Sequence, residues 1–214
     1  MPRILEFTSS PERTAAHGEK LELLAAVLEA GGVVALPTDT VWGVAAMARN
    51  REALSRVFEL KGREPDKPLP IFVADTRAAR DIFLEFPPAF ERLAAAFWPG
   101  ALTLVGAPAG DLPSEVRAAD GTVAVRVPSV RLLQQLLSRL GHPLACTSAN
   151  RSGSPPLVDL AAVERELGHG LALLVATEEP SGGTPSTVVA LQAGVPRVLR
   201  AGAISEEAIL AAVA

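Results

Sequence analysis

The stretch Gly31-Gly32-Val33-Val34-Ala35-Leu36-Pro37-Thr38-Asp39-Thr40 contains the pattern on which the fold depends. Before it, leucine and alanine recur at helical spacing over 19–30, which predicts a helix that the two glycines end. The apolar run 33–36 then predicts a buried strand that ends at Pro37. Polar residues 38–40 follow at once, where the end of a strand meets one edge of a sheet.

Three further polar motifs lie beside apolar runs in the same way. They are Lys61-Gly62-Arg63 with Lys67-Pro68-Leu69, then Thr147-Ser148-Ala149-Asn150, then Pro185-Ser186-Thr187. Strands are predicted at 33–36, 69–74, 101–107, 123–127, 144–146, 171–175, 187–191 and 197–199. Helices are predicted at 19–30, 51–60 with Asn50 as N-cap, 75–83, 88–97, 130–140, 157–167 and 204–213, and a loop at 108–121. Helices and strands interleave without a strict βαβ order, so we expect an α/β fold with a mixed, twisted sheet flanked by helices.

Length and composition limit the classes of protein that fit. A chain of 214 residues, 49% of them hydrophobic, can form a single domain over 1–214, with its core at about 20–204. No apolar run reaches the length of a membrane span, and the N-terminus lacks a signal-peptide layout, so we expect a cytoplasmic protein without membrane association. A single cysteine and three scattered histidines predict no metal held directly by side chains.

The cations at 61–67 support two interpretations. Lys61, Arg63 and Lys67 lie within seven residues, between a predicted helix and a predicted strand. Such a loop can aim several cations at one phosphate or carboxylate, or it can be a solvated charged loop. The net charge of −4 argues against nucleic-acid binding by a whole face of the protein.

The hydroxyl-bearing motifs and two strand arginines are similarly open. Thr40 and Ser148 can bind a ligand or cap a turn, and the glycines of 181–187 can form an anion nest or a hairpin loop. Arg126 and Arg200 either face solvent or are buried with an anionic partner. Familiar nucleotide-binding and hydrolase motifs such as GxxxxGK[ST], GxGxxG and GxSxG are missing. Together the motifs indicate a polar pocket for a small anionic substrate.

Seven segments, taken in order, resemble the YrdC/TsaC family of threonylcarbamoyl-AMP synthases over about 31–204. They lie at 31–43, 61–69, 98–103, 125–128, 147–153, 185–189 and 199–202. The resemblance implies condensation of L-threonine, bicarbonate and ATP into L-threonylcarbamoyl-AMP and pyrophosphate, with Mg²⁺ accompanying ATP. It also implies a separate transferase that uses the product to modify tRNA, and weak contact with RNA is a further expectation.

The resemblance also implies roles for individual residues. Threonine would contact Thr40, Arg126, Ser148 and Ser186. ATP would contact Arg63, Lys67, Thr122, Asn150 and Arg200. Lys61 would support the phosphates, and Lys61 and Arg63 would act electrostatically without a protein nucleophile. Cys146 is expected to be a core residue.

The sequence departs from the family pattern at four positions, and two other functions stay open. Trp42 replaces a usual tyrosine, Ala190 a frequent aspartate, Glu64 separates Arg63 from the usual proline, and Phe72 replaces a histidine found near threonine in some relatives. One alternative is a carbamoyl-adenylate-forming domain of the hydrogenase-maturation type, which threonine dependence would distinguish. The other is a non-catalytic RNA-binding or ribosome-assembly factor, for which nine aromatic residues (seven Phe, two Trp) are poor stacking material.

Overall fold

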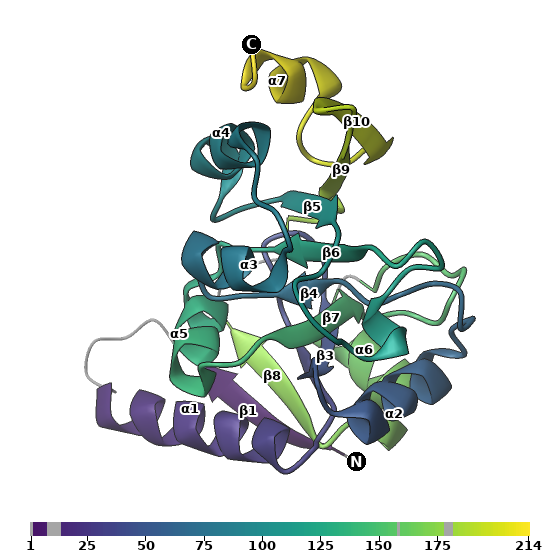
Figure 1. Ribbon diagram of the computed structural model, residues 1–214. Coiled ribbons are helices and arrows are strands. Elements are labelled where there is room, and N and C mark those ends of the chain that lie inside the picture. The colour runs from purple at the N-terminus through teal and green to yellow at the C-terminus, as the bar shows by residue number, and fades with distance from the viewer. Residues whose placement is uncertain (1, 8–13, 158, 178–181) are drawn as a thin grey trace.

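The computed structural model describes residues 2–7, 14–157, 159–177 and 182–214. In this part of the chain, ten strands form one twisted sheet in the order β1-β8-β2-β3-β7-β4-β6-β5-β9-β10 (Figure 1). The strands are β1 (Arg3–Phe7), β2 (Val34–Leu36), β3 (Gly43–Met47), β4 (Ile71–Phe72), β5 (Leu102–Gly106), β6 (Val123–Arg126), β7 (Leu144–Ser148), β8 (Leu173–Thr177), β9 (Thr187–Gln192) and β10 (Val195–Arg200). The pairs β1–β8, β2–β8, β4–β6 and β5–β9 are parallel, and the other pairs are antiparallel. The predicted mixed sheet is confirmed.

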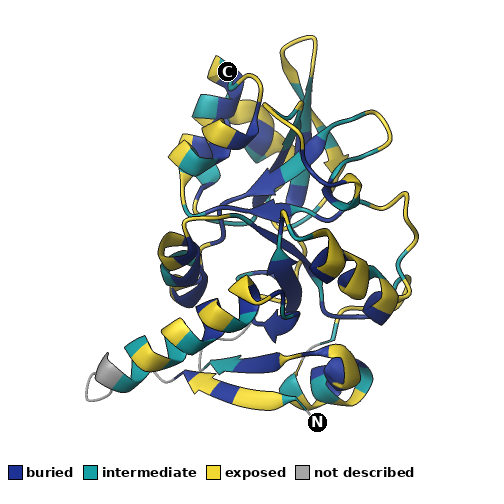
Figure 2. Cartoon of the chain, turned by 60° about the horizontal axis from the view of Figure 1, so that its bottom comes forward, coloured by how far each residue is buried: buried dark blue, intermediate teal, exposed yellow. Residues whose placement is uncertain are grey.

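Helices lie on both sides of this sheet (Figure 1). They are α1 (Thr14–Glu29), α2 (Arg51–Lys61), α3 (Thr76–Ile82), α4 (Pro88–Phe97), α5 (Arg131–Leu140), α6 (Leu160–Leu167) and α7 (Glu206–Ala211), with short 3₁₀ turns at Ser114–Val116 and Gly168–Gly170. Successive residues of β2 alternate between two apolar clusters because side chains alternate across a strand. Val34 and Leu36 pack with α1 and α5, whereas Val33 and Ala35 belong to the cluster that contains α2 and α6. Figure 2 shows the buried residues concentrated in these central strands.

Helix α2 is defined by its sequence at both ends. The Asn50 side chain accepts a hydrogen bond from the backbone N–H of Ala53 at 3.0 Å, as the predicted N-cap requires. Gly62 follows the helix in the left-handed conformation (φ 58°), which glycine adopts at little cost. The helix therefore ends with Lys61 buried against the sheet, and Arg63 begins the loop that follows.

Several predicted boundaries are wrong, and two strands were missed. The edge strand β1 has charged residues at Arg3 and Glu6 and so lacks a period-two pattern, and β3 consists largely of small residues, so neither carries a strong strand signal. Helix α1 begins at Thr14, five residues before its predicted start, and the strand predicted at 69–74 pairs only over Ile71–Phe72. The proposed glycine motif at 181–187 begins at a residue outside the described part of the chain. Within the described residues, no helix has the length and hydrophobicity needed to cross a bilayer.

Candidate functional site

A polar cavity of about 260 Å³ lies where several strands end or begin at one edge of the sheet. The carboxyl ends of β4, β6, β7 and β10 and the amino ends of β5 and β9 meet there, together with the turn between β2 and β3. Six of the predicted site residues line it: Thr40, Arg63, Arg126, Ser148, Ser186 and Arg200. Residues more than 150 positions apart in the sequence therefore share one cavity, as the position of each motif at a strand end predicted.

Arg126 is held in place by four neighbours. The side chain is buried at 3% exposure, and its Nη2 lies 2.7 Å from Oδ2 of Asp39. Its Nε donates to the carbonyl of Gly100 at 2.9 Å, and its Nη1 donates to Oγ1 of Thr40 at 2.9 Å. The guanidinium lies over the ring of Phe72, 5.4 Å from the ring centroid. Of the two possibilities for this strand arginine, the structure shows burial with an anionic partner.

Arg63 and Arg200 also line the cavity, and neither has such a carboxylate partner in the described residues. Arg63 donates from Nε to the carbonyl of Lys67 at 2.6 Å and from Nη2 to the carbonyl of Pro68 at 3.0 Å. Arg200, an exposed residue whose guanidinium lines the cavity, donates from Nη2 to the carbonyl of Ser186 at 2.8 Å and to its Oγ at 3.1 Å. These arginines are oriented by neutral groups that leave their charge uncompensated.

The pKa values of these groups reflect the excess of positive charge. Burial, followed by the charge of Arg200, lowers the pKa of Arg63. Burial of its guanidinium, followed by the charge of Arg126, lowers the pKa of Arg200. Because an incoming anion would relieve this repulsion, the arrangement favours binding of a negatively charged group. Arg63 is the residue of the basic motif that lines the cavity, and the anion-site interpretation stays a prediction.

Lys61 lies behind the cavity wall. At 1% exposure it is one of the most buried side chains of the described chain, and its Nζ donates to the carbonyl of Ser148. Burial, followed by the charge of Arg63, lowers its pKa to about 7. Its own carbonyl accepts from the backbone N–H of Ser152 at 2.9 Å. Lys61 thus fixes the loop that carries Ser148 and does not itself line the cavity.

Three predicted ATP contacts lie outside the cavity lining. Lys67 is exposed and pairs with Glu64 at 2.5 Å. The hydroxyl of Thr122 donates to Oδ1 of Asp120 at 2.7 Å in the turn before β6. The remaining residue, Asn150, is buried, and its Nδ2 donates to the carbonyls of Arg151 and Ser154 at 2.9 and 2.6 Å, which closes the following turn.

The cavity also contains three buried threonines to which the sequence motifs assigned no individual role. Thr38, Thr103 and Thr147 line it, and the hydroxyl of Thr38 donates to the carbonyl of Val41 at 2.6 Å and shapes the turn. Each lies within a motif or segment noted in the sequence, but the sequence does not separate its role from those of its neighbours. Cys146 also lines the cavity, but burial raises its pKa to about 12, so the thiol stays protonated, in agreement with a core role.

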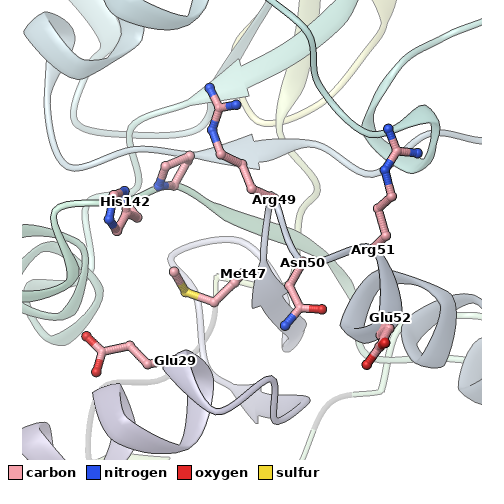
Figure 3. Close-up of a pocket in the computed structure, with 8 residues that line it drawn as sticks. Glu29, Met47, Arg49, Asn50, Arg51, Glu52 and His142 are labelled. Carbon is pink, nitrogen blue, oxygen red and sulfur yellow. The ribbon is translucent and has the colours of Figure 1, made fainter.

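A second, larger hollow of about 660 Å³ contains none of the predicted site residues (Figure 3). Its lining consists of Glu29, Met47, Arg49, Asn50, Arg51, Glu52, His142 and Pro143. In Figure 3, Arg49 and Arg51 extend away from Glu29, so the charged groups do not converge. Asn50 is engaged in capping α2, and Arg49 donates to the carbonyl of Asp111 at 3.2 Å. Size alone does not make this hollow the functional site.

Comparisons with known proteins identify the family that this chain resembles. The family model Sua5_yciO_yrdC, described as telomere recombination, matches residues 26–202. The threonylcarbamoyl-AMP synthase of Bacillus subtilis is 35% identical over 208 residues, which cover 97% of this chain and 60% of that protein. The threonylcarbamoyl-AMP synthase of Nitrosococcus oceani is 34% identical over 152 residues, which cover 71% of this chain and 82% of that protein.

A solved structure gives the same relationship. Pyrococcus abyssi Sua5, complexed with L-threonine, matches with a TM-score of 0.89 and 32% identity over 98% of this chain and 60% of that chain. The chain thus spans less than two thirds of the Bacillus and Pyrococcus proteins. Since the family model covers most of the sequence and the fold agrees along nearly its whole length, this chain belongs to the Sua5/YciO/YrdC family.

Proposed function

We propose that this protein condenses L-threonine, bicarbonate and ATP into L-threonylcarbamoyl-AMP and pyrophosphate, for the synthesis of threonylcarbamoyladenosine in tRNA. One observation carries the proposal. A single cavity is lined by Arg126, whose charge is balanced by Asp39 (the balanced side), and by Arg63 and Arg200, which have no carboxylate partner among the described residues (the unbalanced side). The first side suits the carboxylate of an amino acid, and the second suits a polyphosphate.

The reaction needs two steps that the site can promote by position and charge. The amine of threonine and bicarbonate give a carbamate and water. An oxygen of the carbamate then attacks the α-phosphorus of ATP, the bond from that phosphorus to the bridging oxygen breaks, and pyrophosphate leaves. Both reactants of the second step are anions, so the enzyme must offset their repulsion while holding them together.

Different residues would bind the amino acid, bind the phosphates and support the cavity wall. Arg126 and Thr40 are already oriented and would bind the amino acid, with Ser148 and Ser186 on neighbouring walls. Arg63 and Arg200 would bind the phosphates and the charge that develops on the leaving pyrophosphate. Lys61 would hold the Ser148 loop and add positive charge beneath it. Since the nucleophile comes from the substrate, the protonated thiol of Cys146 needs no part in the chemistry.

Mg²⁺ fits this site as a companion of ATP. The described residues contain no group of three or more histidine, cysteine, aspartate or glutamate side chains that could hold a metal ion, so the phosphates would carry it. When bound, the ion would neutralise part of the phosphate charge. Transfer of the product to a separate tRNA-modifying transferase, weak contact with RNA and a cytoplasmic location stay predictions.

The experiment is mass-spectrometric detection of threonylcarbamoyl-AMP, with pyrophosphate release, from protein given ATP, Mg²⁺, bicarbonate and L-threonine. An Arg63→Ala variant is compared with Arg49→Ala, which removes an arginine bonded to a backbone carbonyl outside the cavity. We expect product that requires threonine, falls in Arg63→Ala and persists in Arg49→Ala. A carbamoyl adenylate formed without threonine would favour the hydrogenase-maturation type, and untouched ATP with salt-sensitive RNA binding would favour the RNA-binding alternative.

A further inference from the structure

The hydroxyl of Ser186 lies between an arginine and a second hydroxyl in the cavity wall. Arg200 Nη2 lies 3.1 Å from Ser186 Oγ, and Thr103 Oγ1 lies 2.9 Å from the same atom. Thr103 and Ser186 are exposed by only 2% and 6%, and both line the cavity. Thr103 ends the segment 98–103 that resembles the family, but the resemblance assigns no individual role to it.

Counting protons assigns the direction of the Arg200 bond, whereas either hydroxyl could donate in the bond between Thr103 and Ser186. A guanidinium N–H can only donate, so Ser186 Oγ must accept from Arg200. A hydroxyl offers one proton and two lone pairs. If Thr103 donates the second bond, both lone pairs of Ser186 are occupied, and the Ser186 proton must find an acceptor elsewhere. The cavity is the open space beside it, and a substrate oxygen would be that acceptor.

We propose that Thr103 is a positioning residue for the synthase reaction: it donates to Ser186 and thereby directs the Ser186 proton to an oxygen of the amino-acid substrate. The inference rests on the proposed function. The same rule gives a different result for Thr40, whose Oγ1 accepts from Arg126 and lies 3.0 Å from Oγ1 of Thr38. Thr38 gives its proton to the carbonyl of Val41, so Thr40 must donate to Thr38. Ser186 is then the hydroxyl of the two whose proton is free for an acceptor-only group such as a carboxylate.

Strand pairing explains why Thr103 can act in this way. In the parallel pair β5–β9, Leu102 lies opposite Thr187 and Thr103 lies opposite Val188. The backbone N–H of Thr187 donates to the carbonyl of Ala101 at 3.0 Å, just before the paired residues. The register of the sheet therefore places Thr103 beside Ser186, and the bond does not depend on a long, adjustable side chain.

The test replaces Thr103 by valine, which keeps the branched shape of the side chain and removes the hydroxyl. We expect the KM for threonine to rise about threefold to tenfold, the range for loss of one neutral hydrogen bond, while the KM for ATP stays within about twofold. Thr103→Ser restores a hydroxyl at the same position and should bring the threonine KM back toward that of the unaltered protein. Thr103→Ala removes the hydroxyl with a different shape and should repeat the selective rise.

The matched control is Thr187→Val. This threonine is also fully buried, but its hydroxyl donates to the carbonyl of Ile204 at 2.7 Å and accepts from the N–H of Ile204 at 2.9 Å, outside the cavity lining. We expect a lower melting temperature and an unchanged KM for threonine. An unchanged threonine KM in both Thr103→Val and Thr103→Ala, or an equal rise of both KM values, would overturn the inference alone. Absence of product from the unaltered protein would overturn the proposed function, and the inference with it.

Discussion

The arginines that line the cavity differ in burial and in charge balance: Arg126 is buried, Arg63 is half-buried and Arg200 is exposed. Arg126 has a carboxylate partner in Asp39, a backbone carbonyl, a hydroxyl and an aromatic ring. Arg63 and Arg200 are oriented by carbonyls and a hydroxyl alone, and each has a pKa that is lowered by burial and by a neighbouring arginine. The charge of Arg126 is balanced without substrate, whereas Arg63 and Arg200 have charge that no carboxylate of the described residues balances at close range. Asp39 Oδ1 is nevertheless buried without a hydrogen-bond partner.

This difference suggests how one small cavity can discriminate between its substrates. An amino acid is nearly neutral overall, so its site needs defined directions more than net charge. A triphosphate carries several negative charges, so its site gains most from positive charge that has not been neutralised. Variants on the first side should therefore affect stability and threonine binding, and variants on the second side should affect ATP binding with little cost in stability.

The largest effect is expected from Arg126→Met. The substitution leaves the Asp39 carboxylate largely buried without its partner, since the carboxylate side chain is only 13% exposed. We expect a loss of about 3 kcal/mol in the free energy of unfolding and a fall in activity of more than about 100-fold. Urea denaturation and initial-rate kinetics measure the two effects.

The double variant Asp39→Asn with Arg126→Met is the control for this prediction. It removes the unpaired charge, so stability should recover in part, because a neutral amide is less costly to bury than a carboxylate. Activity should stay low because the substrate carboxylate still lacks its arginine. A double variant as unstable as Arg126→Met would contradict the role of Asp39 as the charge partner.

A smaller effect on activity, without loss of stability, is expected from Arg63→Ala and Arg200→Ala. Each variant removes about one charge-assisted contact to phosphate, so kcat/KM for ATP should fall about tenfold to 100-fold. The free energy of unfolding should be unchanged or higher because repulsion between the cations is relieved. A loss of stability in either variant as large as that in Arg126→Met would contradict the claim that Arg126 alone of these arginines is needed for stability.

The protonation of Lys61 gives a further test, because it should change when ATP binds beside the uncompensated arginines. Its pKa of about 7 is below the ordinary 10.5, so the unfolded chain holds this proton more tightly and stability contributed by this group rises with pH from about 7 to 10.5. A nearby polyanion favours the charged amine and raises the pKa again. At a pH of about 8.5, binding of Mg-ATP should therefore take up a fraction of a proton, and near pH 6 it should take up almost none.

Calorimetry in two buffers of different ionisation enthalpy measures this uptake. Lys61→Met is the reference, since it cannot bind the proton. Uptake of the same size in the unaltered protein and in Lys61→Met would show that another group is responsible.

The smallest effect is expected from Phe72→Leu. The ring of Phe72 lies 5.4 Å from the Arg126 guanidinium and helps to orient it, but the leucine keeps the site apolar. A cation–π contact of this kind contributes about 0.5–1 kcal/mol, so the KM for threonine should rise about twofold to fivefold. An equal change in the KM for ATP would contradict the assignment of Phe72 to threonine binding.

The sequence predicted the elements whose signals are local. Helix α2 has a cap at Asn50 and a stop at Gly62, and β2 is an apolar run ended by Pro37, so these elements were found. Strands such as β3, made of small residues, depend on their neighbours in the sheet for their conformation and were missed.

The residues of the site, like the elements of the fold, could be predicted from the sequence only in part. Strand ends brought six predicted residues to one cavity, because the position of a strand end follows from the strand itself. Lys67 and Thr122 have partners only two or three positions away, Glu64 and Asp120, and these local contacts hold their side chains. Thr103 lies in the family-like segment 98–103, but its proposed role could not be predicted, since that role depends on the pairing of β5 with β9.

The measurement most directly concerned with the charge difference is the salt dependence of the two KM values on the same enzyme. Raising NaCl from about 0.1 M to about 1 M shortens the Debye length from about 10 Å to about 3 Å. We predict that the KM for ATP rises steeply, that the KM for threonine changes by less than about twofold, and that Arg63→Ala flattens the ATP curve. Parallel rises in both KM values would contradict the division of the cavity into a balanced side and an unbalanced side.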